Sequence, residues 1–302
     1  MTDESMMDAP EPELLPVGDG MVAVYRWPGP KGAPELHFAH ANGFNALTYH
    51  ELLHPLSAHL SVIASDLRGH GRTILPADPS RMKSWSIYAR DLVRLLEVLG
   101  PRPRILAGHS MGAIVSLLAA EARPNLVAGL AMAEPVIMPD VVRWHSAALR
   151  TAGLFDRAMP LIAGALRRRR HFEDRETALA AYRGRGAFRT WPEAMLKGYL
   201  EGGLRSDEAG GMELACAPEW EAANFRIGPP AIWEAWRGFS RPLVVLHGSH
   251  GSTVRPITLS RLRRLNAHAR FVHIPQASHF LPMEVPDTVR QEILRVLREV
   301  RL

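Results

Sequence analysis

The most constraining feature of the 302-residue sequence is a Gly-His-Ser-Met-Gly stretch at residues 108–112. It follows a short apolar run at 104–107 and precedes a longer apolar run at 113–120, which Pro124 ends. The first run predicts a buried strand and the second a buried helix. Glycines two residues before and after Ser110 permit a tight turn there, because larger side chains would clash. The start of a helix directs free N–H groups at an anion, so Ser110 is a candidate nucleophile.

The composition predicts a globular protein with a large core. Hydrophobic residues make up 47% of the chain and charged residues 22%, as in folded proteins. The single cysteine, Cys216, excludes an internal disulfide and fits a reducing compartment. Residues 1–16 are acidic and lack the apolar core of a secretory signal, and no apolar run reaches the roughly 18 residues of a membrane span. We expect a soluble, cytoplasmic protein without a membrane partner.

The net charge of +5 raises the question of a nucleic-acid partner. The basic residues are scattered, apart from four consecutive arginines at 167–170. Acidic residues follow that run at 173, 174 and 176, which is typical of a solvated helix face. We therefore predict no nucleic-acid partner, and the sequence leaves homo-oligomerisation open.

Strand-like and helical patterns alternate on both sides of the central stretch. Several of the strand-like runs are apolar throughout, which indicates a mostly parallel sheet covered by helices on both faces. The fold class is therefore α/β. Strands are expected at 21–27, 35–40, 60–65, 104–107, 126–133, 241–248 and 270–274, and helices at 49–59, 84–99, 113–120 and 285–302.

The alternation is interrupted between residues 139 and 238, where helical stretches occur without a clear strand. We predict an inserted helical cap at 139–238, a core at 20–138 and 239–302, and a flexible leader at 1–19. Five of the seven tryptophans lie in this segment and indicate an apolar lid. They are Trp144, Trp191, Trp220, Trp233 and Trp236.

Several motifs occur in an order that resembles the α/β-hydrolase fold family, in its capped serine esterase- and lipase-like branch. They are the loop at His40, the Asp-Leu-Arg-Gly-His-Gly stretch at 66–71, the turn at Ser110, the gap for a cap, and Ser-His-Phe-Leu at 278–281. The resemblance covers nearly all of the chain from residue 20 onward.

A serine hydroxyl needs a base to become a nucleophile, and the pKa of imidazole suits that task. The resemblance implies that His279, in the loop after the last strand, is this base. The family usually has Gly before the histidine, where this chain has Ser278.

A carboxylate should orient the imidazole. In most of the family it follows the strand after the cap, but residues 248–254 contain no carboxylate and Gly251 stands at the expected position. Glu134 ends the strand that follows the helix after Ser110, which is similar to the acid of haloalkane dehalogenase-like members. Glu134 is therefore the expected acid. The alternatives are a strand-end carboxylate bonded to the loop or cap, and Asp140 as a weaker candidate.

Two backbone N–H groups should stabilise an oxyanion. The resemblance implies that Met111 supplies one and the loop after His40 the other. The family's His-Gly-x pattern aligns in two ways, giving Asn42 or Phe44, and both stay open.

These residues imply a serine hydrolase that cleaves carboxylic esters of small to medium apolar substrates through an acyl-enzyme. Lactonase, thioesterase and perhydrolase chemistry need the same groups. Dehalogenation and epoxide hydrolysis in this fold resemble cases with Asp in place of Ser110. The alternative from another class is a ligand-binding protein on a hydrolase scaffold. No metal-ligand spacing and no phosphate loop occur, so we expect no cofactor and no metal.

Overall fold

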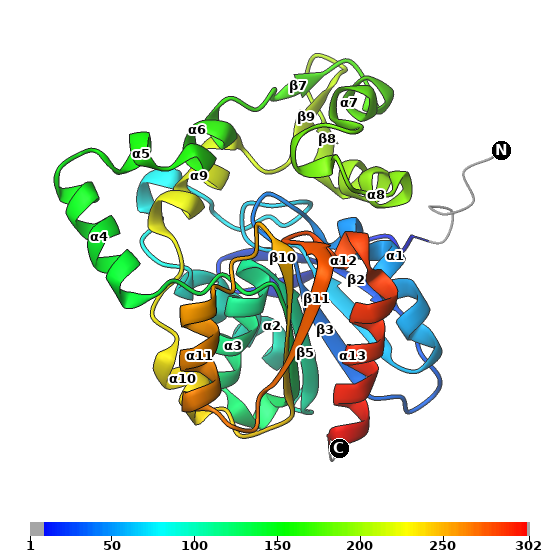
Figure 1. The fold of residues 1–302 in the computed structure, drawn as a ribbon. Helices are drawn as coiled ribbons and strands as arrows, with labels where there is room; N and C mark the ends of the chain where they lie inside the picture. The colour runs from blue at the N-terminus through cyan, green and yellow to red at the C-terminus, as the bar shows by residue number, and fades with distance from the viewer. Residues whose placement is uncertain (1–8, 301–302) are drawn as a thin grey trace.

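The computed structural model describes residues 9–300. Eight strands form one sheet in the order β1-β2-β4-β3-β5-β6-β10-β11, with helices on both faces (Figure 1). β2 is antiparallel to β1 and β4, and the other neighbouring pairs are parallel, as expected from the strand pattern. The strands are β1 (Glu13–Val17), β2 (Gly20–Trp27), β3 (Glu35–Ala39), β4 (Ser61–Ser65), β5 (Arg104–His109), β6 (Val127–Ala133), β10 (Leu243–His250) and β11 (Arg270–Ser278).

Each face of the sheet has its own layer of helices. Along β5, Leu106 packs toward one layer, whereas Ile105 and Ala107 pack toward the other, because side chains alternate across a strand. The first layer contains α2 (Ser86–Val98), α3 (Met111–Ala122), α10 (Trp233–Gly238) and α11 (Pro256–Leu265), and the second contains α1 (His50–Leu53), α12 (Leu281–Glu284) and α13 (Pro286–Glu299). Short 3-10 helices complete the core at Ala46–Tyr49, His54–Ala58, Pro79–Arg81 and Pro124–Leu126.

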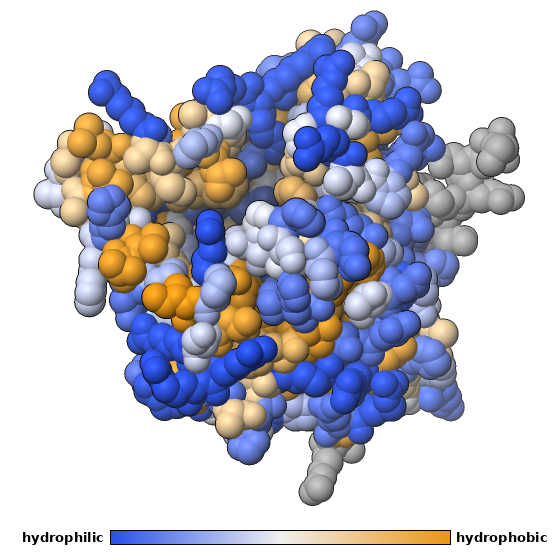
Figure 2. All heavy atoms as spheres, in the orientation of Figure 1, coloured by the Kyte–Doolittle hydropathy of each residue, from blue (hydrophilic) through white to orange (hydrophobic). Residues whose placement is uncertain are grey.

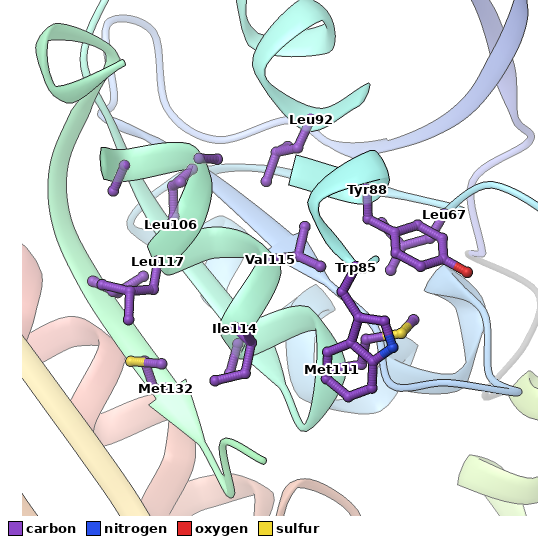
Figure 3. Close-up of a cluster of buried hydrophobic side chains, with 14 of the residues drawn as sticks. Leu67, Trp85, Tyr88, Leu92, Leu106, Met111, Ile114, Val115, Leu117 and Met132 are labelled. Carbon is purple, nitrogen blue, oxygen red and sulfur yellow. The ribbon is translucent and has the colours of Figure 1, made fainter. Parts of the chain in front are cut away.

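Helix α3 holds the central position among the helices. Nine of its twelve residues are buried, which explains why its sequence is apolar on all sides. Ile114 and Leu117 lie toward Leu106 and Met132 of the sheet (Figure 3). This packing fixes the first turn of α3 against the ends of the central strands.

Part of the expected leader is a strand. β1 pairs with β2 in antiparallel register, from Glu13 opposite Val24 to Val17 opposite Gly20. Gly18 adopts a φ of 61° in the turn between them. The expectation of a flexible leader at 1–19 is therefore wrong for 13–17, and residues 1–8 lie outside the described part. The strand was not predicted because it is short and its surroundings are acidic and contain proline, which is not typical of a strand.

The inserted segment forms a cap over the carboxyl ends of the parallel strands (Figure 1). Its helices are α4 (Asp140–Thr151), α5 (Phe155–Ala158), α6 (Pro160–Leu166), α7 (Arg175–Tyr182), α8 (Glu193–Gly203) and α9 (Pro218–Ile227), with a 3-10 turn at Gly186–Phe188. It also contains a three-stranded sheet, β7 (His171–Phe172), β9 (Met212–Leu214) and β8 (Leu204–Ser206), which corrects the expectation of a purely helical cap. These strands have only two or three residues, too few for a visible period.

The last part of the expected cap belongs to the core. Trp236 of α10 is fully buried, and its indole N–H donates to the Leu262 carbonyl of α11 at 3.0 Å. The core therefore resumes before residue 239. Trp144 differs from the expected lid in another way, because it is 73% exposed on α4. Figure 2 shows hydrophobic surface on the left of the cap, where Figure 1 draws α4 and α5.

Candidate active site

Ser110 lies at the turn from β5 into α3, with a φ of 56° and a ψ of −114°. Its N–H donates to the Ala133 carbonyl at 3.0 Å, which ties the turn to β6. A Cβ on Gly108 would lie 2.5 Å from the backbone of Gly112, and a Cβ on Gly112 would lie 2.1 Å from the Ala39 carbonyl oxygen. Both glycines are therefore required by contact with backbone atoms.

The structure brings His279 to Ser110. His279 Nε2 lies 3.0 Å from Ser110 Oγ, within hydrogen-bond distance of the candidate nucleophile. The His279 N–H donates to the His250 carbonyl at 3.1 Å. Ser278, where the family usually has Gly, donates its N–H and its hydroxyl to the Glu284 carboxylate. Glu284 therefore holds the loop that carries His279.

Glu134 is the carboxylate that reaches His279. Its Oε2 lies 3.3 Å from His279 Nδ1. The carboxylate is fully buried and also accepts from the Gly248 N–H at 2.6 Å and the Thr253 N–H at 2.9 Å. Burial raises the pKa of Glu134. His279 lowers it through a hydrogen bond and its positive charge, and the hydrogen bonds from the Gly248 and Thr253 N–H groups add to this effect. Together these interactions outweigh burial, so the pKa of Glu134 is below its usual value.

The end of β10 and the loop after it bind this carboxylate instead of supplying one. Gly248 and Thr253 flank the position where the family usually has its acid, and both donate to Glu134. Gly251 adopts a φ of 62° with open space around a Cβ position. The anchoring role of Thr253 has no signal in the sequence, because it lies 119 residues from Glu134. Asp140 pairs instead with Arg261 and Trp233, away from His279.

The loop after β3 distinguishes the two candidate oxyanion donors. The Phe44 N–H donates to the Ala41 carbonyl at 3.1 Å, and the Gly43 N–H donates to His70 Nε2 at 3.0 Å. The Ala41 N–H donates to the Tyr49 hydroxyl at 3.1 Å. Within residues 41–44, only the Asn42 N–H has no protein partner in the described structure. The Phe44 alternative therefore does not fit, and Asn42 is the remaining candidate.

The N–H of Met111 is a second free donor beside Ser110. Met111 is the first residue of α3, and the opening N–H groups of a helix have no partner within it. The helix dipole adds positive potential at the same place. The start of α3 can therefore stabilise an oxyanion that forms beside Ser110.

Two buried histidines support the loop at residues 41–44 after β3, called here the Asn42 loop. His40 Nε2 accepts from the Leu67 N–H at 2.8 Å, and its Nδ1 lies 2.7 Å from the Ala41 carbonyl. His70 Nε2 accepts from Gly43. Burial lowers the pKa of His70 to about 4 and that of His40 well below its usual value, so both rings are neutral at neutral pH.

Aromatic side chains from the core and the cap meet beside His279. Phe44 lies 5.2 Å from Trp191 and 5.7 Å from Tyr199, measured between ring centroids. Phe280, the residue after His279, stacks on Phe44 at 6.3 Å and lies 5.8 Å from Trp191. Of the five tryptophans in the segment predicted as the cap, Trp191 is the one in this aromatic cluster. The cluster makes one side of the site apolar.

Residues 9–300 contain neither a candidate metal cluster nor a candidate membrane-spanning helix. No cluster of three or more His, Cys, Asp or Glu side chains is arranged to hold a metal ion. No helix in the same range has the length and apolar character needed to cross a membrane.

Comparison with known proteins agrees with the fold and the motif order. Residues 38–292 match the description "Alpha/beta hydrolase family". The chain belongs to the alpha/beta hydrolase family. This hydrolase is 26% identical over 260 residues to 2-(acetamidomethylene)succinate hydrolase of Mesorhizobium japonicum, a match that covers 86% of each chain. It is 24% identical to esterase Rv0045c of Mycobacterium tuberculosis, over 98% of this chain and 92% of that protein.

A solved structure of E-2-(acetamidomethylene)succinate hydrolase superposes with a TM-score of 0.78 at 23% identity. The superposition covers 95% of this chain and 98% of the other. The shared fold therefore extends over the core and the cap.

Proposed function

We propose that this hydrolase cleaves carboxylic esters through an acyl-enzyme on Ser110. The observation that carries the proposal is the Ser110 Oγ to His279 Nε2 distance of 3.0 Å, with Glu134 on the opposite ring nitrogen. A hydroxyl, an imidazole and a carboxylate in this order form the arrangement that activates a serine. The similarity to a named esterase over nearly the whole chain supports the same reaction class.

The reaction follows from the geometry. His279 Nε2 removes the Ser110 hydroxyl proton as Oγ attacks the ester carbonyl carbon. The N–H groups of Met111 and Asn42 stabilise the oxyanion. The intermediate collapses, His279 returns the proton to the leaving alkoxide, and an alcohol departs. Water then attacks the acyl-enzyme with His279 as base again, releasing a carboxylic acid and free Ser110.

Glu134 takes the role of the orienting acid in this proposal. Its Oε2 accepts from His279 Nδ1–H, which leaves Nε2 unprotonated and facing Ser110. Its charge stabilises the imidazolium that forms during attack. A carboxylate with a lowered pKa stays ionised across the neutral range, as this role requires.

The alternative of a ligand-binding protein without catalysis drew its support from the missing carboxylate after β10. The proposed role of Glu134, directly after β6, supplies a carboxylate from another strand and argues against this alternative. Lactones, thioesters and peracid formation need the same residues and stay within the proposed class.

Small to medium apolar esters fit the surroundings best. The aromatic cluster of Phe44, Trp191, Tyr199 and Phe280 lies directly beside His279. Arg168 of the cap donates to the Tyr199 hydroxyl of this cluster, but it is already paired with Glu221 at 2.6 Å. Because that charge is neutralised, an apolar acyl group is favoured over the succinate-type substrate named for one relative.

Steady-state hydrolysis of p-nitrophenyl esters tests the proposal. The panel runs from acetate to decanoate and includes a succinate monoester. We expect turnover that prefers apolar acyl groups and a loss of at least about 10⁴-fold in Ser110→Ala. Ser116→Ala, a matched change in the helix that follows Ser110, should retain activity. Equal rates for wild type and Ser110→Ala would contradict the proposal.

A further inference from the structure

A chain of buried polar groups links the Asn42 loop to the backbone of His279. The Ala41 N–H donates to the Tyr49 hydroxyl at 3.1 Å, and the Tyr49 oxygen lies 2.7 Å from His109 Nδ1. His109 Nε2 lies 2.8 Å from the His279 carbonyl oxygen. Tyr49 and His109 are both fully buried, so no water competes for these groups.

The direction of each hydrogen bond follows from the chemistry of its partner. A carbonyl oxygen only accepts, so His109 Nε2 carries a proton and donates to His279. In the neutral ring Nδ1 then accepts, and the Tyr49 hydroxyl must be its donor. The Tyr49 oxygen accepts in turn from Ala41. Burial and the nearby His279 lower the pKa of His109 to about 3, so the ring stays neutral at neutral pH.

These bonds connect the three parts of the candidate site. His109 directly precedes Ser110, so its side chain joins the nucleophile's backbone to the backbone of the base. The His279 N–H is already bound to His250, and the bond from His109 fixes its carbonyl as well. At the other end, Tyr49 holds Ala41, the residue before the free N–H of Asn42.

We propose that His109 and Tyr49 are positioning residues that set the placement of Ser110, His279 and the Asn42 N–H relative to one another. The inference rests on the proposed function, because it assigns these residues to the same site. Neither residue reaches the reacting atoms, and both act through groups that do. Small displacements of reacting groups lower the rate strongly, so hydrogen bonds that fix the distances between these groups should raise the rate.

Tyr49→Phe tests the link with a minimal change. The variant keeps the ring and removes the hydroxyl, leaving Ala41 N–H and His109 Nδ1 without partners. Tyr25→Phe is the matched control, because Tyr25 is also buried and its hydroxyl donates to Asp66 at 3.1 Å, outside this chain of groups. Active sites are counted with a fluorophosphonate, and kcat and KM are then measured per active site.

We expect kcat per active site to fall about tenfold in Tyr49→Phe, with KM changed less than about twofold. Tyr25→Phe should keep the wild-type kcat per active site. A merely structural role for Tyr49 would lower the number of active sites or the Tm and leave the kcat of each site unchanged.

His109 is tested by two substitutions that differ in one hydrogen bond. His109→Gln places an amide donor near the position of Nε2, whereas His109→Leu removes the donor to His279. We expect the Gln variant to retain more kcat per active site than the Leu variant, and equal losses would overturn the assigned bond.

The outcomes separate this inference from the proposed function. Absence of any fluorophosphonate adduct on folded wild type overturns the proposed function and the positioning role together. An active wild type with equal kcat per active site in Tyr49→Phe and Tyr25→Phe overturns the positioning role alone.

Discussion

Ser110 and Glu134 share an uncommon backbone conformation. Within residues 9–300 they are the two non-glycine residues with positive φ, at 56° and 47°. Such conformations cost about 1–3 kcal/mol each and persist only where surrounding contacts enforce them. At Glu134 the enforcing contacts are the bonds from Gly248 and Thr253. The two residues also lie next to the two ring nitrogens of His279, Ser110 at Nε2 and Glu134 at Nδ1. This placement favours a catalytic role over a structural one.

Glu134→Gln tests the acid at the scale of one residue. The amide retains the size of the carboxylate, but its NH₂ group can face His279 Nδ1, which favours the wrong tautomer and places a proton on Nε2. We expect kcat to fall by about 10³–10⁴-fold with the fold intact. Glu97→Gln, an exposed surface change, is the control. Near-wild-type turnover by Glu134→Gln would remove Glu134 from the triad.

At the scale of the elements, the turn from β5 to α3 depends on the close approach of two backbones. Gly112 of α3 meets the end of β3, where a methyl group would lie 2.1 Å from the Ala39 oxygen. Because that atom is backbone at the end of a central strand, it cannot move aside without displacing the sheet.

Gly112→Ala should therefore destabilise the protein by more than about 3 kcal/mol, or prevent folding. Gly164→Ala is the matched control, since Gly164 lies in α6 with open space around it and should gain about 0.5–1 kcal/mol. Urea unfolding followed by circular dichroism measures both changes. Equal stability of the two variants would show that the close contact is not required.

The sequence predicts those helices and strands that are long enough to show a pattern of apolar residues within the element itself. β5 and α3 are largely apolar and α13 has one apolar face. The family resemblance, and not these patterns alone, implied that the loop carrying His279 reaches Ser110. β7 pairs with β9, a strand far along the chain, and β7, β8 and β9 are all too short to show alternation. The sequence also does not distinguish Asn42 from Phe44 as the oxyanion donor, because the choice depends on which N–H groups of one turn already donate hydrogen bonds.

At the scale of the whole molecule, buried neutral histidines make the fold sensitive to acid. Burial lowers the pKa of His37 and His109 to about 3, that of His70 to about 4, and that of His40 well below its usual value. The unfolded chain binds protons at these rings near pH 6.5, whereas the folded chain does not. Stability is therefore complete above about pH 6.5 and declines as the pH falls toward 4.

Each such histidine should lower the unfolding free energy by up to about 1.4 kcal/mol per pH unit within this range. Urea unfolding at about pH 7, 6 and 5 measures the decline. His37→Leu removes one titrating ring, so its curve should be shallower than that of wild type. A stability that does not change over this range would contradict the neutral, buried state of these rings.

The proposed reaction depends on the activation of Ser110 by His279 and Glu134. Intact-mass measurement after treatment with a fluorophosphonate tests it most directly, because the reagent reacts with an activated serine hydroxyl. We expect a single adduct on wild type and none on Ser110→Ala. A folded wild type without an adduct, or an adduct that persists in Ser110→Ala, would show that Ser110 is not the activated nucleophile.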